Sequence, residues 1–313
     1  MSGRRRLRVG VVGTGAMGSN HVRILAALPE VDLVGLYDQR PEVAAALAAE
    51  HGTESFASVE GLAAEIEAVV LAVPTYGHAR LGAELLAAGC HLLVEKPMAS
   101  SLDEADELLA AAGDRVLAVG HVEFFNPAVQ ALVALGGAVR YLEVQRLSPF
   151  TPRSLDVDVI LDLMIHDLQI LHALDPSPIA EIRASGIEVM SDKVDMVSAR
   201  IALASGAVAN LSASRVAAET VRKLRVYQER RYLSLDYRQQ AIKGFGLREV
   251  GRQRLIVPQQ LTVHRCEPLR AELEAFVAAC RGEPAQIVDG TMGRRALETA
   301  LAVRDAIGER AGH

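Results

Sequence analysis

The chain has 313 residues, a length that predicts about two domains and excludes a single small module. Hydrophobic residues make up 50% and charged residues 23%, which is typical of a folded globular chain and too apolar for a disordered one. Aromatic residues are 4% and Trp is absent, so a stacking surface for single-stranded nucleic acid is not expected. The net charge of −6 argues against nucleic acid as a partner but leaves room for a local basic pocket.

The cysteines and the N-terminal stretch indicate where the protein works. Cys90, Cys266 and Cys280 lie far apart and show no metal-ligand spacing, so we expect a reducing compartment and no metal. The basic start is followed by the glycine-interrupted stretch Val9–Gly15, which we interpret as a strand rather than a signal peptide. No run approaches the roughly 18 apolar residues of a membrane span. We therefore expect a cytoplasmic protein that does not contact a membrane.

Residues 1–120 alternate short apolar runs with longer amphipathic ones, a pattern that predicts βαβ units on a parallel sheet. The expected strands are Leu7–Val12, Val31–Tyr37, Ala68–Ala72, His91–Val94 and Val116–Val119. The expected helices are Met17–Leu28, Pro41–His51, Tyr76–Ala88 and Leu102–Ala112. These elements approach one whole doubly wound Rossmann domain, which binds NAD(P) in many proteins.

Residues 121–313 have a different pattern, with alternating segments joined by tight turns, which predicts a mostly antiparallel open sheet. The segments are Ala138–Arg146, Val194–Ala202, Ala207–Ala213, Thr220–Gln228 and Tyr232–Asp236, and the expected helices are Val157–Leu174, Leu269–Cys280 and Gly290–Gly308. The predicted fold is thus an α/β Rossmann domain followed by an α+β domain for substrate binding and oligomerisation. We expect the chain to return to the first domain near its C-terminus.

The first motif is a glycine-rich turn between the first expected strand and helix, with the residues Gly13, Gly15, Ala16, Met17 and Gly18. Its first glycine allows the tight turn, its second lets the backbone approach a pyrophosphate, and its third allows close packing of helix on strand. The N–H groups at the start of the helix then face the phosphates. The motif predicts dinucleotide binding rather than a purely structural turn.

Asp38 and Arg40 bear on which dinucleotide binds. Asp38 stands 20 residues after Gly18, at the end of the second expected strand, where a carboxylate accepts hydrogen bonds from a ribose diol. The same carboxylate repels a 2′-phosphate, so NAD is favoured over NADP. Arg40 has two equally weighted interpretations, a contact with adenine or a 2′-phosphate and a solvated surface side chain.

The sequence Glu95-Lys96-Pro97 ends the fourth expected strand, on the edge where open α/β sheets bind ligands. We interpret Lys96 as a lysine near the nicotinamide and the reacting hydroxyl, with its proton affinity lowered by burial and by the positive cofactor ring. The alternative is a solvated lysine at a strand end.

Asp158, Asp162 and His166 are spaced by four residues, which would place them on one face of a helix. Asp162 could then hydrogen-bond the His166 ring and fix its tautomer. An oriented imidazole beside a lysine can accept an alcohol proton while hydride leaves the same carbon. The alternative is a structural histidine on a helix that an aspartate caps.

These motifs, in this order, resemble the Gfo/Idh/MocA family of sugar and inositol oxidoreductases over nearly the whole chain. The similar stretches are Arg8–Gly18, Ala72–His78, Glu95–Pro97, Gly120–Pro127, Leu161–Asp167, Glu267–Leu269 and Arg294–Glu298. The resemblance implies an NAD(H)- or NADP(H)-binding Rossmann domain, and a C-terminal sheet that supports the sugar and a homodimer or homotetramer interface. It also implies Lys96, Asp162 and His166 as the catalytic group, with Pro74, His78 and Glu95 in the cofactor site and Asn126 at the substrate.

The stretch Gln145–Asp162 is similar to a bacterial branch of the family. That branch oxidises the 3-hydroxyl of UDP-N-acetylglucosamine to the 3-keto sugar, on the way to a diamino sugar of lipid A. Arg146 and Arg153 are expected to bind the substrate pyrophosphate, or else to pair with a nearby aspartate.

Two other functions stay open. The first is a dehydrogenase of an inositol or a free aldose, which gains if the two arginines point away from the substrate. The second is a non-catalytic dinucleotide-binding regulator, which would be expected to lose Lys96 or His166.

Overall fold

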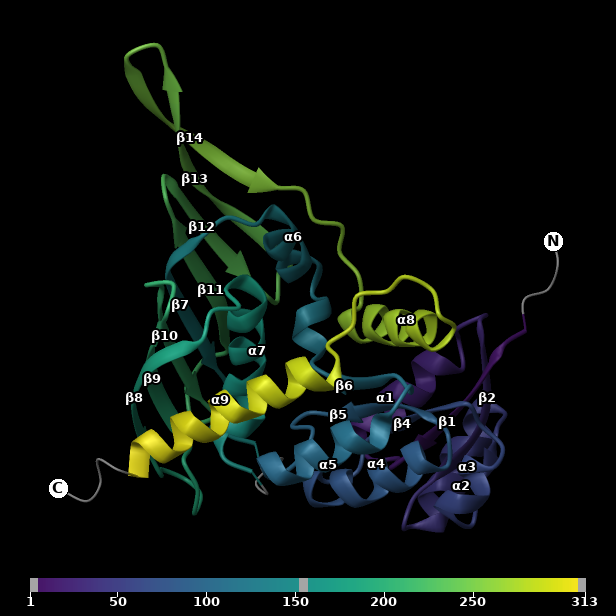
Figure 1. Cartoon of the computed structure of the whole chain (residues 1–313). Coiled ribbons are helices and arrows are strands. Elements are labelled where there is room, and N and C mark those ends of the chain that lie inside the picture. Colours follow the sequence, from purple (N-terminus) through teal and green to yellow (C-terminus); the bar gives the residue numbers. More distant parts are fainter. Residues whose placement is uncertain (1–4, 152–156, 309–313) are drawn as a thin grey trace. The chain divides into compact units, whose positions relative to one another are not determined.

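The computed structural model describes residues 5–151 and 157–308, in which the chain forms two compact units (Figure 1). Unit 1 runs to Val122 and takes in Leu269–Leu297, and unit 2 holds Glu123–Pro268 and the chain from Glu298 onward. The predicted fold class is confirmed, with a parallel Rossmann sheet in unit 1 and a mostly antiparallel sheet in unit 2. Within the described residues, no helix is long and apolar enough to cross a membrane.

Unit 1 is built on a six-stranded parallel sheet in the order β3-β2-β1-β4-β5-β6. The strands are β1 (Leu7–Val12), β2 (Val31–Tyr37), β3 (Glu54–Ser55), β4 (Ala68–Leu71), β5 (His91–Glu95) and β6 (Leu117–Gly120). All four residues of β4 are buried, as expected for a central parallel strand that is covered on both faces. The strand order reverses between β1 and β4, and ligands of such sheets bind at the carboxyl ends of the strands around this point.

The helices of unit 1 are α1 (Ala16–Leu25), α2 (Pro41–His51), α3 (Val59–Ala63), α4 (His78–Ala87), α5 (Leu102–Ala112) and α8 (Pro268–Cys280), with a 3₁₀ turn at Thr75–Gly77. The expected strands and helices of this half are present, within a few residues of their predicted ends. The sequence did not predict β3 and α3. The reason is that β3 is two exposed polar residues long and α3 five residues long, too short for a periodic pattern.

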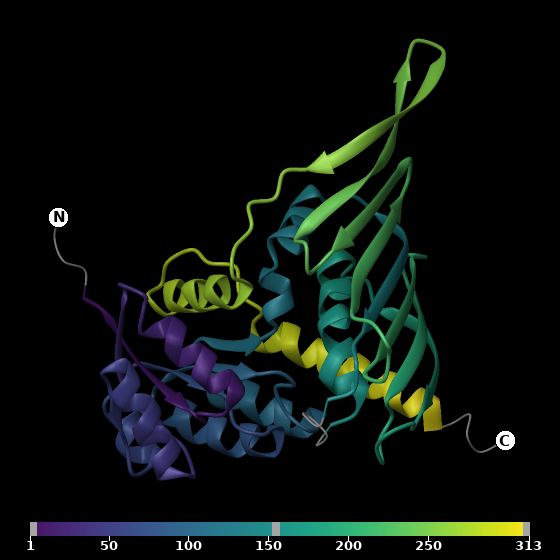
Figure 2. The same cartoon turned by 180° about the vertical axis from the view of Figure 1, so that it is seen from behind.

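Helix α8 belongs to the core of unit 1 although it follows unit 2 in the sequence. Its residues Leu273 and Phe276 are fully buried and pack in one cluster with Val22 and Leu25 of α1 and Val9 of β1. Figure 2 shows α8 in yellow-green beside α1 in purple. The Rossmann unit is therefore completed by a segment from the last fifth of the chain.

Unit 2 is built on an eight-stranded sheet in the order β14-β13-β12-β11-β7-β10-β9-β8. The strands are β7 (Val139–Leu147), β8 (Ile179–Ile187), β9 (Met196–Leu203), β10 (Val208–Ser214), β11 (Val221–Gln228), β12 (Arg231–Asp236), β13 (Ala241–Val250) and β14 (Gln253–Leu261). The β7–β10 pair is parallel and the other pairs are antiparallel. From Tyr141 to Leu147, strand β7 alternates between half-buried and buried residues, so that Leu142, Val144 and Arg146 lie on its buried face.

The helices of unit 2 are α6 (Pro127–Leu135) and α7 (Ile165–Leu174), followed by the later part of α9 (Gly290–Gly308). Figure 1 shows α6 and α7 over one face of the eight-stranded sheet. The expected continuous helix from Val157 to Leu174 is interrupted, because residues Ile160–Met164 form a π-helical turn before α7 begins. The sequence did not predict α6, β8, β13 or β14.

Candidate functional site

The glycine-rich turn has the geometry that the motif predicts. Gly13 has a φ of +92°, and a Cβ there would lie 2.6 Å from the Ala72 carbonyl oxygen, so the turn requires glycine. A Cβ on Gly18 would lie 1.8 Å from the Gly13 carbonyl oxygen, so this position also requires glycine. At Gly15, by contrast, no described atom beyond the neighbouring residues of the chain lies within 4 Å of the Cβ position. Space is therefore open at the one glycine that a pyrophosphate should approach.

Helix α1 begins directly after this turn, at Ala16, and its start suits an anion. No side chain of the described residues caps its first N–H groups, and its first turn contains no acidic residue. Ala16 and Met17 are exposed there. The unpaired N–H groups and the positive end of the helix dipole together favour a phosphate group. The turn and helix start therefore fit the diphosphate of a dinucleotide.

Asp38 follows β2 and holds the glycine-rich turn. Its carboxylate accepts hydrogen bonds from the Thr14 N–H (2.7 Å) and hydroxyl (2.9 Å), and from the Arg40 N–H (3.0 Å) and Nε (3.2 Å). Burial raises the pKa of Asp38, but these hydrogen bonds lower it by more, so the pKa lies below its ordinary value. Asp38 is thus a fixed carboxylate at the edge of the nucleotide site. Arg40 pairs with it while the side chain of Arg40 is 61% exposed.

Pro74 and His78 shape the loop that follows β4. Pro74 precedes the 3₁₀ turn at Thr75–Gly77, and His78 opens α4. The buried His78 ring has Nδ1 2.9 Å from the Pro97 carbonyl oxygen and Nε2 2.9 Å from the Val73 carbonyl oxygen. Burial lowers the pKa of His78, so the neutral ring donates to one carbonyl at a time. His78 therefore ties the loop after β4 to the loop after β5.

Glu95 and Lys96 lie at the end of β5, in front of a cis peptide bond to Pro97. The buried Glu95 carboxylate is 2.7 Å from Nε2 of His21, and it accepts a 3.3 Å hydrogen bond from the Lys96 N–H. Burial raises the pKa of Glu95, but the hydrogen bond and charge of His21, followed by the charge of Lys96, bring it below its ordinary value. A Cβ on Gly120 would approach this carboxylate to 3.0 Å, so Gly120 makes room for it.

Two histidines near this strand end were not singled out from the sequence. His21 lies on α1 and is fully buried, and His121 follows β6 and is 1% exposed. Burial, and then the positive charge of Lys96, lower the pKa of His121 to about 3. One weak signal for His121 was available, since it stands at the end of an apolar strand, as Glu95 and Lys96 do.

In unit 2, the residues Asp158, Asp162 and His166 do not form the simple helical face that their spacing predicted. Asp158 caps the start of the helix, since its Oδ1 accepts from the N–H groups of Ile160 (3.0 Å) and Leu161 (2.9 Å). Asp162 lies in the π-helical turn, half-buried, and His166 lies in α7 with 8% exposure. The i→i+5 bonding winds the chain more loosely than an α-helix, and such turns are frequent at functional sites. The hydrogen bond between Asp162 and His166 stays a prediction.

Arg146 is held inside unit 2 rather than presented to a ligand. Its Nε and Nη2 donate to the two Asp167 oxygens at 2.7 and 2.8 Å, and its Nη1 donates to Glu123 at 2.8 Å. Tyr237 donates its hydroxyl to Asp167 at 3.0 Å and lies 4.8 Å beneath the guanidinium. Arg222 Nη1 donates to the same Glu123 carboxylate at 3.1 Å. The side chain of Arg146 is 1% exposed, so the expected pyrophosphate contact does not agree with its placement.

The expected substrate contacts of Asn126 and Arg153 are not supported by the structure either. Asn126 is 2% exposed and caps α6, with its Oδ1 accepting from the Ala128 N–H and its Nδ2 donating to the Tyr237 carbonyl oxygen. Both ends of its side-chain amide are therefore used within unit 2. Arg153 lies outside the described residues.

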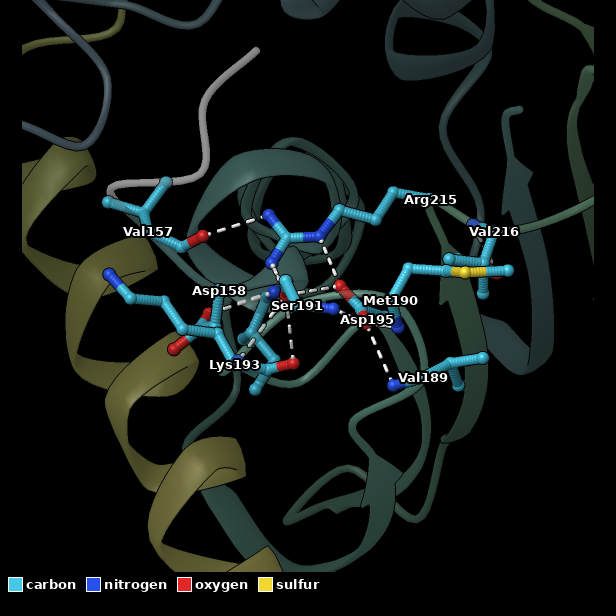
Figure 3. A network of polar contacts seen from close by, with 11 residues as sticks. Val157, Asp158, Val189, Met190, Ser191, Lys193, Asp195, Arg215 and Val216 are labelled. Carbon is cyan, nitrogen blue, oxygen red and sulfur yellow. Dashed lines mark hydrogen bonds and ion pairs between the residues drawn. The ribbon is translucent and has the colours of Figure 1, made fainter. Parts of the chain in front are cut away.

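A second buried ion pair fixes the start of the same helix (Figure 3). Asp195 accepts the Arg215 Nε at 2.7 Å, and it also accepts the N–H groups of residues 189–191 at 2.6–2.9 Å. Arg215 Nη1 donates to the Val157 carbonyl oxygen at 2.9 Å, and the Val159 N–H donates to the Val194 carbonyl oxygen at 3.0 Å. Burial raises the pKa of Asp195, but the hydrogen bond from the Ser191 hydroxyl at 2.7 Å, together with those from the backbone N–H groups and Arg215, brings it well below its ordinary value. The loop from Val189 to Asp195 thus anchors the segment that leads to Asp158.

Comparison with known proteins agrees with these observations. A family model described as "Oxidoreductase family, NAD-binding Rossmann fold" and bearing the name Gfo/Idh/MocA matches residues 7–121. The chain is 40% identical over 306 residues to the UDP-N-acetylglucosamine 3-dehydrogenase of Acidithiobacillus ferrooxidans, which covers 96% of this chain and 97% of that protein. A solved structure of the A. ferrooxidans enzyme superposes with a TM-score of 0.89 at 39% identity, covering 97% of this chain and 98% of the other. The inositol 2-dehydrogenase of Leifsonia xyli subsp. xyli is 30% identical over 190 residues, which is 56% of each chain.

The buried pair of Arg146 and Asp167 leads to a prediction about stability. Replacing Arg146 by Met leaves Asp167 buried without its bidentate partner, so we expect a loss of about 3–5 kcal/mol in the free energy of unfolding. Arg222→Met is the matched control, because the Arg222 side chain is 32% exposed and should cost about 1 kcal/mol or less. Urea unfolding followed by circular dichroism at neutral pH measures both. Equal losses for the two variants would contradict a supporting role for the buried pair.

Proposed function

Because the chain belongs to the Gfo/Idh/MocA family of NAD-binding oxidoreductases, we propose that it oxidises the 3-hydroxyl of UDP-N-acetylglucosamine to the 3-keto sugar with NAD as cofactor. The observation that carries this proposal is the 40% identity over 306 residues to an enzyme with that name. The similarity extends over 96% of this chain, so it includes unit 2 as well as the nucleotide-binding unit.

The residues of unit 1 fit the parts of the cofactor. The backbone from Gly13 to Gly18 and the start of α1 would bind the diphosphate, as the open space at Gly15 favours. Asp38 is ionised and would accept hydrogen bonds from the ribose hydroxyls, which favours NAD over NADP. Pro74, His78 and Glu95 would hold the loops at the carboxyl ends of β4 and β5. When bound, the nicotinamide supplies the acceptor for the hydride that leaves the sugar carbon.

The proton of the sugar hydroxyl requires a base, and Lys96 or His166 would serve as that base. Asp162 would orient the His166 ring, and the Asp167–Arg146 pair would hold the backbone of α7 at the next residue. The two candidate bases would be coupled through the charge of the bound cofactor, so a pH–rate profile would describe the group of residues together. Arg146 is therefore proposed as a positioning residue, and Arg153 remains the candidate for the pyrophosphate.

A dehydrogenase of an inositol or another polyol is the second candidate. Two observations favour it, namely the buried position of Arg146 and the similarity to an inositol 2-dehydrogenase over 56% of the chain. The identity to that enzyme is lower and covers less of the chain than the identity to the sugar-nucleotide enzyme. The non-catalytic regulator ranks below both, because Lys96 and His166 are both present.

Several further points belong to the same proposal. The 3-keto product would be aminated on the way to a diamino sugar of lipid A. The eight-stranded sheet would form a homodimer or homotetramer interface. The three widely spaced cysteines favour a reducing compartment and hence a cytoplasmic location. The net charge of −6 argues against nucleic acid as a partner.

The substrate assignment predicts which compound reduces NAD. With this protein, UDP-N-acetylglucosamine should raise NADH absorbance at a much higher kcat/KM than myo-inositol, free N-acetylglucosamine or glucose. UDP alone is the control for reduction that does not depend on the sugar. Reduction with inositol or a free aldose, without reduction with the sugar nucleotide, would replace the first candidate by the second.

The catalytic assignment predicts a separation of turnover from cofactor binding. Lys96→Ala and His166→Ala should each lower kcat by at least about 100-fold, because general base catalysis contributes about 10²–10⁴-fold. NADH fluorescence titration should show a much smaller change in the Kd of either variant. Wild-type turnover in both variants would contradict the assignment.

The role of Asp38 predicts the cofactor preference. The wild type should prefer NAD over NADP in kcat/KM, because the ionised carboxylate repels a 2′-phosphate. Asp38→Ser should lower kcat/KM for NAD and raise the NADP/NAD ratio, with the exposed Arg40 available to the phosphate. A wild-type preference for NADP would show that Arg40, not Asp38, determines the choice.

A further inference from the structure

Glu272, in the middle of α8, is a buried acid that neither the motifs nor the proposed mechanism uses. It is 2% exposed, and both carboxyl oxygens lack a hydrogen-bond partner among the described residues. Its helix neighbours Leu273 and Phe276 are in the apolar core of unit 1. Ionising a carboxyl in such a place costs several kcal/mol, whereas the protonated acid avoids most of that cost.

Glu95 is the charged group that acts on Glu272 within the described part of unit 1. Burial, and in second place the charge of Glu95, raise the pKa of Glu272 well above its ordinary value of 4.5. Glu95 itself has the opposite environment, with His21 at 2.7 Å and the Lys96 N–H at 3.3 Å. Two neighbouring acids whose environments differ in this way divide into one carboxylate and one neutral acid.

We propose that Glu272 is protonated inside unit 1, so that Glu95 and Glu272 together carry one negative charge. The single charge of the pair lies on Glu95, directly before Lys96 in the sequence and within hydrogen-bonding distance of its backbone. The protonation of Glu272 does not depend on the proposed function.

The protonation has a consequence for stability that depends on pH. The folded state keeps a proton that the unfolded state releases above about pH 4.5, so the stabilising contribution is complete below that pH. It is lost as the pH rises toward the raised folded-state pKa. Over that range, the unfolding equilibrium constant gains a factor of up to about ten per pH unit from this one group.

The experiment compares the wild type with Glu272→Gln by urea unfolding between pH 5 and pH 9. We expect the ratio of the wild-type to the variant unfolding constant to rise with pH by up to about tenfold per unit. Glu272→Leu should give the same ratio slope even if its absolute stability differs. Glu274→Gln is the matched control on the same helix, because the Glu274 side chain is 50% exposed and pairs with Arg270. Its unfolding constant should change with pH as the wild-type constant does.

His78, His91 and His121 also have shifted pKa values in unit 1, but they are the same in every variant and cancel in the comparison. If the unfolding constants of the wild type and Glu272→Gln changed with pH in parallel from pH 5 to pH 9, the protonation of Glu272 would be overturned. This comparison needs no substrate, so it decides the point even if UDP-N-acetylglucosamine is not oxidised.

Discussion

A carboxylate inside a protein must be paired with a positive charge, hydrogen-bonded, or neutralised by binding a proton. This constraint applies to the buried carboxyl groups of both units. In unit 1, Glu95 has His21 and the Lys96 N–H as partners, whereas Glu272 has none among the residues that the structure describes and is proposed to be neutral. In unit 2, Asp167 lies against Arg146. The groups proposed for catalysis, Lys96 and His166, directly follow or precede one of these paired carboxylates in the sequence. Their surroundings are therefore stiff, because displacing a paired carboxylate would expose or orphan a charge.

The nucleotide-binding unit could be predicted well from the sequence because local physics decides most of it. Buried parallel strands appear as continuous apolar runs, and the positions of Gly13 and Gly18 follow from a turn that tolerates no Cβ. Asp38 could be located because it stands at a fixed distance from that turn. The contact of His21 with Glu95 and the burial of Glu272 could not be predicted, because they depend on helices that lie far from β5 in the sequence.

Unit 2 was less predictable because its details depend on long-range pairing. The strands β8, β13 and β14 lack strict apolar alternation, since several of their residues are exposed on both faces. Arg146 was expected to reach the substrate, yet it continues the buried alternation of Leu142 and Val144 and pairs inward. That alternation was visible in the sequence. Its acidic partners, Asp167 and Glu123, lie 21 and 23 residues away and follow no spacing rule.

The position of α8 affects how the protein can be made. Unit 1 consists of the chain up to Val122 and of Leu269–Leu297, so its core cannot close while a ribosome has synthesised the first part alone. Until α8 emerges, the faces of α1 and β1 that pack in one cluster with Phe276 stay uncovered, although the strands of unit 2 have already been synthesised. Maturation of the nucleotide-binding unit is therefore a late event in biosynthesis, despite its N-terminal location. A nascent chain stalled before residue 269 would present an apolar surface of the kind that chaperones bind.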